Sequence, residues 1–321
     1  MTSQNENGDS RLMRPVIIGS RGSKLALAQT RLMQAELRRL APEIETRIEV
    51  IKTSADRDQI TSLRVPAEVS GPGVFVKELE QTLLRGEIDL AVHSMKDVPT
   101  ATAEGLCIAA IPEREDARDA LVANGSISLA ELPAGARIGS GSFRRQAQML
   151  ALRPDLRILD IRGNVDTRIH KMEQGHYDAV ALACAGLRRL GLQHRISYTF
   201  TFDEMLPAPG QGALAIETRA DDTFTNGVAA KLNHPATALA VAAERDFLEC
   251  LGGGCNVPIA IHARMDQGIL KMDAVVASPD GKLVVRDAVS GTPEKSAELV
   301  AMLAERILGA GGREILHEFR R

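Results

Sequence analysis

The stretch VIIGSRGSKLALA, residues 16–28, decides the fold class because it joins a strand to a helix through a short turn. Residues 16–19 are apolar and rich in β-branched side chains, which predicts a strand, and Ser23 is a suitable N-cap for the helix that follows. The apolar residues that this helix places on one face are Leu25, Ala28, Leu32 and Ala35.

The same alternation continues along the chain. Residues 46–51 and 88–92 predict two more strands, and residues 75–84 between them have helical spacing. A βαβαβ order predicts a mostly parallel sheet with helices on both faces. A similar pattern restarts at Ala136, with strands predicted at 137–139, 156–161 and 179–183 and helices from Ser142 and at 165–172.

The C-terminal part has a different pattern. Its predicted elements are a helix at 236–251, strands at 259–263, 269–277 and 282–289, and a helical segment from Pro293. This order is typical of an α+β domain. We therefore expect an α/β protein with two doubly wound domains and a smaller α+β C-terminal domain. Residues 52–73 have no clear period and are a candidate lid.

Composition excludes several classes of protein. The chain has 321 residues, 44% of them hydrophobic, and no run of about 18 apolar residues that could span a bilayer. Residues 1–15 lack the features of a signal peptide, so we expect a cytoplasmic protein. The spacing of cysteines and histidines predicts neither disulfides nor a metal site. A net charge of −3, 3% aromatic residues and no Trp argue against nucleic-acid binding.

Lys96 and Asp97 lie in the segment 91–99, at the C-terminal end of the third predicted strand. Open parallel sheets bind ligands beyond the carboxyl ends of their strands, which is where these two residues fall. An aspartate there can act as an acid, a base or the counter-ion of a cation. A solvated Lys-Asp turn is the alternative interpretation.

Residues 137–168 contain seven arginines and no lysine. Arg144 and Arg145 follow a turn of small residues that opens a helix, where backbone N–H groups and the helix dipole favour an anion. Guanidinium groups bind carboxylates and phosphates in a bidentate manner. Together these arginines predict a cleft for a polyanion, although each one alone also fits a surface ion pair.

Cys255 lies between three glycines and Asn256-Val257-Pro258, in a predicted helix-to-strand turn. The glycines remove side chains from around the sulfur, and a turn exposes it. Taken alone, a glycine-rich turn that happens to contain a cysteine explains this pattern as well as a functional thiol does.

In this order, the motifs resemble the porphobilinogen deaminase family from about Val16 to the C-terminus. The segments that carry the resemblance are residues 20–26, 75–80, 91–99, 112–116, 142–146, 162–165, 185–191, 207–213 and 252–258.

The resemblance implies an enzyme that condenses four porphobilinogen molecules onto a dipyrromethane cofactor, joined to Cys255 by a thioether, and then releases hydroxymethylbilane. Asp97 matches the catalytic carboxylate, which assists loss of ammonia and stabilises the azafulvene-type cation. The other residues implied for the cofactor are Lys96, Ser142, Arg144 and Arg145. Those implied for the substrate are Arg21, Ser23, Phe75, Arg162, Arg168 and Arg189. The family needs no metal, and we expect a monomer without nucleic-acid or membrane partners.

The resemblance also implies that the first two domains are similar to periplasmic binding proteins, with the chain returning to the first domain near Gly210-Gln211-Gly212. The boundaries that follow are a tail at 1–15, domain 1 at 16–112 and 210–232, domain 2 at 113–209 and domain 3 at 233–321.

Three positions depart from the family pattern. Gly141 stands where a hydroxyl residue is frequent, Pro72 replaces a common lysine of the lid, and Lys24 replaces a frequent proline. Two other hypotheses stay open: a non-catalytic anion-binding module, and a thiol-dependent hydrolase with Cys255 as its nucleophile. The hydrolase would need a base, and no histidine has a sequence context that suggests one.

Overall fold

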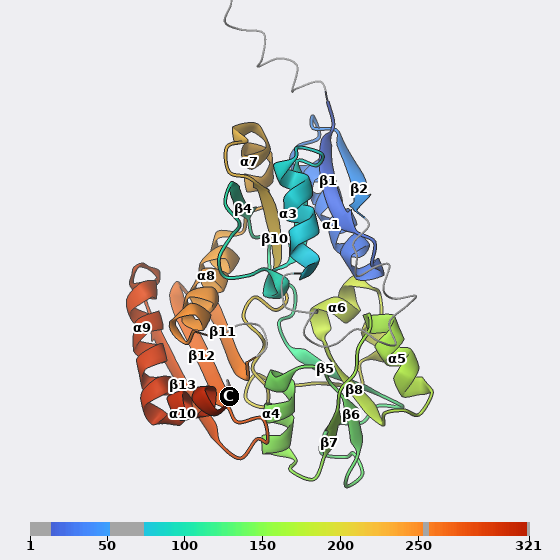
Figure 1. Ribbon diagram of the computed structural model, residues 1–321, viewed down its shortest axis with the longest axis vertical. Coiled ribbons are helices and arrows are strands. Elements are labelled where there is room, and N and C mark those ends of the chain that lie inside the picture. Colours follow the sequence, from blue (N-terminus) through green and yellow to red (C-terminus); the bar gives the residue numbers. More distant parts are fainter. Residues whose placement is uncertain (1–13, 52–73, 253–256, 320–321) are drawn as a thin grey trace, which may run out of the picture. The chain divides into compact units, whose positions relative to one another are not determined.

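The computed structural model describes residues 14–51, 74–252 and 257–319 (Figure 1). The chain divides into two compact units, which are described separately below. The first unit contains the chain up to His93, Ala101–Pro112 and Leu214–His234. The second contains Ser94–Thr100, Glu113–Ala213 and the chain from Pro235 onward. The candidate lid at 52–73 and Cys255 lie outside the described residues.

The first unit is built on a five-stranded sheet in the order β2-β1-β3-β10-β4. Its strands are β1 (Val16–Arg21), β2 (Thr46–Ile51), β3 (Leu90–Ser94), β4 (Leu106–Ala110) and β10 (Leu214–Arg219). β1 pairs in parallel with β2 and β3, whereas β4 runs antiparallel to β10. The helices of the unit are α1 (Lys24–Leu40), α3 (Val74–Leu84) and α7 (Thr223–Ala230).

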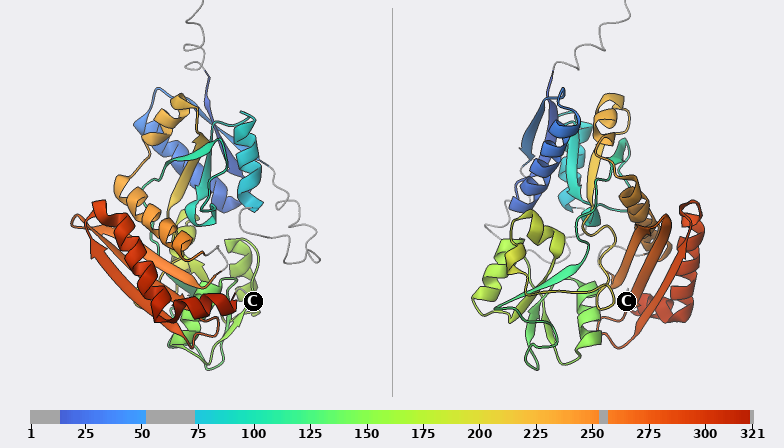
Figure 2. Two further views of the ribbon diagram at one scale, coloured as in Figure 1. Left: turned by 60° about the vertical axis from the view of Figure 1, so that its left-hand side comes forward. Right: turned by 180° about the vertical axis from the view of Figure 1, so that it is seen from behind.

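Alternate side chains of β1 contact helices on opposite faces of this sheet, because successive residues of a strand point in opposite directions. Ile18 belongs to a buried cluster that includes Leu37 of α1 and Val228 of α7. Its neighbour Ile17 packs in another cluster, with Leu79 of α3. The unit is therefore doubly wound, as predicted (Figure 2).

The buried face of α1 is not the one that the apolar spacing predicts. The residues that the helix buries are Gln29, Thr30, Met33 and Leu37. Leu32, which belongs to the predicted face, is 45% exposed. Thr30 is satisfied in this buried position because its Oγ1 donates a hydrogen bond to Ser20 Oγ, 2.9 Å away near the end of β1. The prediction of this helix face was therefore wrong.

The second unit contains another five-stranded sheet, in the order β7-β6-β8-β5-β9. Its strands are β5 (Asp119–Ala123), β6 (Arg137–Gly139), β7 (Arg157–Leu159), β8 (Ala179–Ala183) and β9 (Tyr198–Thr199). β6 is parallel to β7 and β8, whereas β5 is antiparallel to β8 and β9. The helices are α4 (Phe143–Leu152), α5 (Val165–Glu173) and α6 (Cys184–Arg189).

Helices cover both faces of this sheet as well. Met149 of α4 packs in a cluster with Ile138 of β6. On the opposite face, Ile169 of α5 and Leu187 of α6 pack in a cluster with Val180 of β8. This arrangement confirms a second doubly wound sheet, with antiparallel strands that the sequence did not predict.

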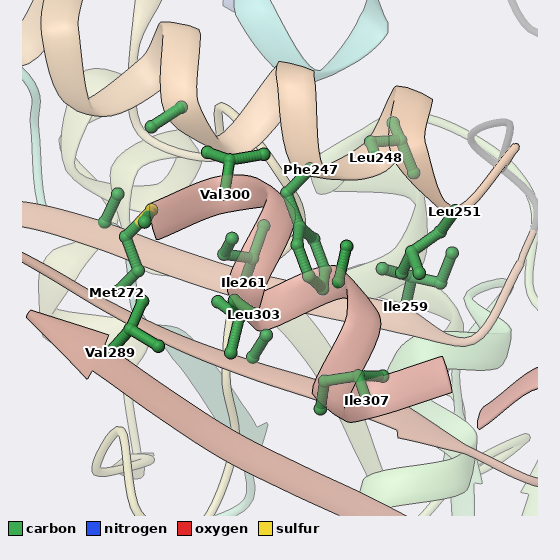
Figure 3. Close-up of a cluster of buried hydrophobic side chains, with 14 of the residues drawn as sticks. Phe247, Leu248, Leu251, Ile259, Ile261, Met272, Val289, Val300, Leu303 and Ile307 are labelled. Carbon is green, nitrogen blue, oxygen red and sulfur yellow. The ribbon is translucent and has the colours of Figure 1, made fainter. Parts of the chain in front are cut away.

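The second unit also contains a three-stranded antiparallel sheet in the order β11-β12-β13. Its elements are β11 (Ile259–Asp266), β12 (Ile269–Ala277), β13 (Val284–Gly291), α8 (Pro235–Cys250), α9 (Ser296–Ile307) and α10 (Arg313–Phe319). Phe247 of α8 and Leu303 of α9 pack with Ile261 in the core on one face (Figure 3). The other face contributes Val275 to a cluster with Ala147 of α4.

These sheets confirm the α/β class and the α+β character of the C-terminal part. The remaining short elements are η3 (Met95–Asp97), η4 (Gln193–Arg195), η5 (Pro293–Lys295) and the π-helical turn η6 (Leu308–Gly312). The boundaries of the three domains stay a prediction. None of the helices in the described part of the chain is long and apolar enough to cross a membrane.

Candidate functional site

Lys96 and Asp97 lie just past the carboxyl end of β3, where the sequence placed them. They belong to the short helix η3, and the backbone N–H of Met95 in that helix donates to Ala213 O at 3.1 Å. The Met95 side chain is buried, Lys96 is half-buried and Asp97 is exposed. The buried methionine holds the turn, so that the carboxylate of Asp97 is open to a ligand.

Arg245 of α8 holds the backbone on the other side of Asp97. Its guanidinium donates to the carbonyls of the next three residues, Val98, Pro99 and Thr100, at 3.1, 2.6 and 3.0 Å. Carbonyl groups that follow a short helix lack partners within it, and a guanidinium has enough N–H donors to satisfy several of them. The segment that carries Asp97 is thus fixed at both ends.

Arg144 and Arg145, at the start of α4, both bind the buried carboxylate of Asp119. Nη1 of Arg144 lies 2.7 Å from Asp119 Oδ2, and Nε and Nη2 of Arg145 lie 3.0 and 2.8 Å from Oδ1. The arginines are 5% and 6% exposed, and Asp119 is fully buried. Burial alone raises the pKa of Asp119, but the charges of Arg144 and Arg145 outweigh it, so this pKa lies well below its ordinary value.

Gln211 connects Asp119 to Lys96. Its amide Nε2 donates to Asp119 Oδ1 at 2.9 Å and to Ala117 O at 2.7 Å. Its Oε1 accepts from Lys96 Nζ at 3.5 Å. Burial and the charge of Arg145 lower the pKa of Lys96 to about 8, although Asp97 and Asp119 act in the opposite direction. Three cations are thereby linked to one fully buried carboxylate.

Arg189 and Arg168 add two further guanidinium groups in the same unit. Arg189 Nη2 donates to Gly212 O at 2.6 Å, and its buried Nε has no partner among the described residues. Burial lowers the pKa of Arg189 to about 10. Arg168 Nε donates to Gly163 O at 2.8 Å. Burial, followed by repulsion from Arg145, lowers the pKa of Arg168, which indicates that these two guanidinium groups act on each other.

Gly212 is required by the close approach of two chain segments beside Arg189. Its φ of +88° is unfavourable for residues with a side chain, and a Cβ there would lie 2.3 Å from Glu115 O. The contact allows Glu115 N to donate to Gly212 O at 3.2 Å. Gly212 O thus accepts from both Glu115 and Arg189.

Ser142 and Arg162 have more ordinary surroundings. Ser142 caps α4, with its Oγ accepting from Arg145 N at 3.4 Å, so the predicted helix start is confirmed. The side chain of Arg162 is 63% exposed and pairs with Asp160 at 3.3 Å. Other arginines of the 137–168 run form surface pairs instead, as Arg137 does with Asp178 at 2.8 Å.

Four predicted site residues are not part of this group: two belong to the first unit, and the other two have side chains that the structure does not describe. Arg21 ends β1 and Ser23 caps α1, with Ser23 Oγ accepting from Ala26 N at 3.2 Å. Both belong to the first unit. Phe75 is in α3, but its side chain is not described, and Cys255 lies in the undescribed segment 253–256. Their roles stay predictions.

Comparison with known proteins identifies the family. The model described as "Porphobilinogen deaminase, dipyromethane cofactor binding domain" matches residues 16–227. The chain belongs to the porphobilinogen deaminase family. A second model, "Porphobilinogen deaminase, C-terminal domain", matches residues 238–309. The expected family membership is therefore confirmed.

Similar relatives are named porphobilinogen deaminase, and the matches cover nearly the whole length of both chains. The porphobilinogen deaminase of Pelobacter propionicus is 48% identical over 306 residues, which cover 95% of this chain and 97% of that protein. The porphobilinogen deaminase of Thermus thermophilus is 45% identical over 309 residues, covering 96% and 100%.

Solved structures with some likeness to the chain include two periplasmic proteins. An ABC transporter substrate-binding protein from Coxiella burnetii has a TM-score of 0.43 at 14% identity, and the match covers 72% of this chain and 96% of that one. The aliphatic sulphonate binding protein of Escherichia coli has a TM-score of 0.37 at 18% identity, covering 73% and 69%. Neither likeness bears on the activity of the chain.

Sequence reasoning missed the acidic partners of the site. Asp119 is the first residue of the apolar run DALVA. A lone carboxylate at the start of a buried strand needs a partner, so this pattern could have predicted a buried ion pair. Glu244 of α8 was also missed. It is fully buried and accepts from Arg114 Nη1 and Nη2 at 2.7 and 3.1 Å, and from the N–H groups of Gly210 and Ala263 at 2.6 and 2.8 Å.

The described residues contain no group of His, Cys, Asp or Glu arranged to hold a metal ion. The cysteines among them differ in exposure: Cys184 is buried, Cys107 is half-buried and Cys250 is exposed. Burial raises the pKa of Cys184 to about 11, which keeps this thiol protonated and unreactive. The charged side chains beside Asp97 are basic: Lys96, Arg144 and Arg145. Such a group suits a ligand that carries carboxylates.

Proposed function

We propose that this chain catalyses the stepwise deaminative condensation of four porphobilinogen molecules onto a dipyrromethane held by the protein, and then releases hydroxymethylbilane by hydrolysis. Membership of the porphobilinogen deaminase family supports this reaction. The observation that carries the proposal is the group formed by Lys96, Arg144 and Arg145 beside the exposed carboxylate of Asp97. It combines an acid–base group with cations for an acidic ligand.

The residues present fit a dipyrromethane. Each of its pyrrole rings carries an acetate and a propionate, so the group needs several cations in a partly dry setting. Lys96, Arg144 and Arg145 supply them, and each guanidinium has five N–H donors, of which the bonds to Asp119 and to backbone carbonyls use only some. Ser142, the cap of α4, completes the set that we assign to the cofactor. When bound, the dipyrromethane supplies the pyrrole carbon to which the first substrate joins.

Asp97 is the group that we assign to the chemistry. Its exposed carboxylate can hold the pyrrole N–H of a substrate, stabilise positive charge that develops as ammonia leaves, and then accept the proton from the new bond. The fixed backbone on both sides of Asp97 keeps this group in place during each of the four additions.

A growing chain of pyrroles adds carboxylates with every step. We assign the binding of these carboxylates to the polar and basic site residues that do not hold the cofactor. We assign to Phe75 a contact with a pyrrole ring. The cationic and hydroxyl groups in this set are Arg21, Ser23, Arg162, Arg168 and Arg189. Among them, Arg189 offers a buried Nε–H without a partner in the described chain, as expected of a group that awaits an anion.

We assign the anchor of the cofactor to Cys255, through a thioether, and expect the enzyme to act as a cytoplasmic monomer. The intact mass of the denatured protein tests this assignment. We expect an adduct equal to two pyrrole units in the wild-type chain and its loss in Cys255→Ser, because a thioether survives denaturation.

Cys250→Ser is the matched control, since Cys250 is an exposed thiol at the end of α8, close to Cys255 in sequence. It should keep the adduct. An unmodified mass in a preparation that consumes porphobilinogen would overturn the anchor. A preparation with neither adduct nor porphobilinogen consumption would overturn the proposed function and favour a binding module.

A further inference from the structure

Asp119 is the fully buried acidic group to which the cations of the site are linked. It accepts one hydrogen bond from Arg144, two from Arg145 and one from Gln211. Its position at the first residue of β5 places it inside the unit, with no exposed surface through which a ligand could reach it. A role in direct contact with substrate is therefore excluded for this carboxylate in the structure.

Two guanidinium groups side by side in a buried setting repel each other unless an anion lies between them. Asp119 supplies that anion, with one oxygen for each arginine. Lys96 brings a third positive charge to the same group, and its ammonium contacts Gln211 rather than Asp119 directly. Gln211 is 1% exposed, so its amide has a fixed orientation, with Nε2 toward Asp119 and Oε1 toward Lys96.

We propose that Asp119 and Gln211 are positioning residues, which hold the Lys96 ammonium beside the guanidinium groups of Arg144 and Arg145 so that three cations can bind the carboxylates of one ligand. This inference rests on the proposed function for the identity of that ligand. The linkage itself is a property of the chain's own residues. Gln211 carries the influence of Asp119 to Lys96, and neither residue touches the substrate.

The charge of Lys96 is sensitive to this linkage. The charged groups that act on it are Asp97 on its own element, Arg144 and Arg145 of α4, and Asp119 of β5. Its pKa of about 8 means that a small change in these surroundings alters how much of the ammonium is present at neutral pH. Removal of the Asp119 charge, or of the Gln211 oxygen that accepts from the ammonium, disfavours the protonated form.

The test measures the protonation of Lys96 directly. The full-length chain and its variants are acetylated briefly with acetic anhydride over a range of pH, and the modification of Lys96 is followed by peptide mass spectrometry, because only the neutral amine reacts. Adduct content is recorded by intact mass, so that variants are compared at equal content. The wild-type chain gives the reference midpoint with which the variants are compared.

In Asp119→Asn and in Gln211→Leu we expect the midpoint to move to lower pH by at least about half a unit, which is roughly a threefold gain in labelling at pH 7. The double variant should shift by less than the sum of the two single shifts, because Gln211 transmits part of the effect of Asp119. A midpoint that stays at its wild-type value in both single variants would overturn the proposal.

Gln148→Leu is the matched control. Gln148 is also a buried glutamine of the same unit and is 5% exposed. Among the described residues its amide bonds only backbone groups: it donates to Leu206 O and Arg144 O and accepts from Leu206 N. It should lower stability as Gln211→Leu does but leave the Lys96 midpoint unchanged. An equal shift in this control would show that loss of packing, rather than the linkage, moves the midpoint.

The labelling result does not depend on turnover. If the wild-type chain releases no ammonia from porphobilinogen but the midpoints move as expected, the proposed function fails and the linkage stands. If the chain is active and the midpoints do not move, the linkage fails and the proposed function stands.

Discussion

At the scale of single residues, the two aspartates of the site have opposite surroundings. Asp97 is exposed at the end of β3, whereas Asp119 is fully buried between two arginines. A carboxylate that must exchange protons with a ligand has to be accessible, and one that must stay ionised as a counter-charge benefits from burial beside cations. The difference supports our proposals that Asp97 takes part in the chemistry and that Asp119 positions the cations.

Asp97→Asn should keep the fold and the covalent adduct but lower turnover of porphobilinogen at least about a hundredfold, the usual contribution of a general acid or base. An amide of the same shape cannot exchange the proton, and an exposed position tolerates the change. The rate of ammonia release measures the loss. Asp203→Asn, which alters a fully exposed carboxylate of the same unit, should leave the rate unchanged. Near-normal turnover in Asp97→Asn would remove Asp97 from the chemistry.

Glu244→Gln should destabilise the protein by about 3 kcal/mol, because it leaves the guanidinium of Arg114 without its buried counter-charge. Chemical denaturation measures the difference. The exposed pair of Arg85 and Glu87 provides the control, and Glu87→Gln should leave the unfolding midpoint nearly unchanged because water screens that pair. Equal effects of the two substitutions would show that burial of Glu244 adds nothing to its ion pair.

At the scale of elements, α4 connects the site to the three-stranded sheet. Its first turn carries Arg144 and Arg145, while Ala147 one turn later packs against that sheet. Gln146 Nε2 of the same helix donates to Pro279 O at 3.1 Å in the turn between β12 and β13. The position of the two arginines therefore depends on how closely this turn approaches the helix.

Gly281, in that turn, should not tolerate a side chain. Its φ is +71°, and a Cβ there would lie 2.5 Å from Ala151 N and 2.7 Å from Ala147 O, which are backbone atoms of α4. Gly268 has a similar φ of +80° but open space around it. Gly268→Ala should cost about 1 kcal/mol for the left-handed backbone, and Gly281→Ala about 2 kcal/mol more for the clash. Equal unfolding midpoints for the two variants would contradict close packing of the turn on α4.

The elements that the sequence predicted best have clear local signals. β2 and β12 match their predicted bounds, and α5 matches to within a residue, because β-branched content or apolar spacing marks each of them in the sequence. β5 was missed because it is short and begins with a charged residue, Asp119, whose partners come from α4. The buried row of α1 was missed because Thr30 is polar, and the hydrogen bond that satisfies it in a buried position does not show in the apolar spacing.

The site also has some features that local sequence patterns predict and others that they do not. The positions of Lys96 and Asp97 past a strand end, and of Ser142 at a helix start, were predictable because strand ends and helix caps are visible in sequence. The roles of these residues stay predictions. The number of arginines suggested a cationic cleft, but the sequence did not say which of them pair with surface acids, as Arg137 does. That depends on contacts between segments far apart in the chain, such as the bond from Gln211 to Asp119. These contacts follow from tertiary packing, which local patterns do not contain.

At the scale of the molecule, a buried histidine connects the three-stranded sheet to the segment before Pro207. The His262 ring of β11 stacks on Phe202 with ring centroids 4.0 Å apart, and its Nδ1 is buried without a partner among the described residues. Arg286 of β13 strengthens the same junction by donating to the carbonyls of Phe202 and Asp203 at 3.0 and 2.7 Å. Burial, then the charges of Arg114 and Arg264, lower the pKa of His262 to about 3.

This shift predicts that acid weakens the junction. The ordinary pKa of histidine is 6.5, so above that pH the ring is neutral in both the folded and the unfolded chain and adds no pH dependence. Between pH 6.5 and about 3 the unfolded chain binds a proton that the folded chain excludes, so stability falls as the pH falls. Below about 3 both states are protonated and this loss is complete.

His262→Phe should therefore protect the protein against acid. Phenylalanine keeps the stacking on Phe202, removes the buried nitrogen that lacks a partner and cannot bind the proton. The free energy of unfolding of the variant, relative to the wild-type chain, should rise by up to about 3 kcal/mol as the pH falls from 6.5 to 4, since each unit of pKa difference is worth about 1.4 kcal/mol. Urea denaturation at a series of pH values measures it. Parallel curves for the two proteins would mean that His262 titrates alike in both states, and the acid sensitivity of the fold would then lie with other groups.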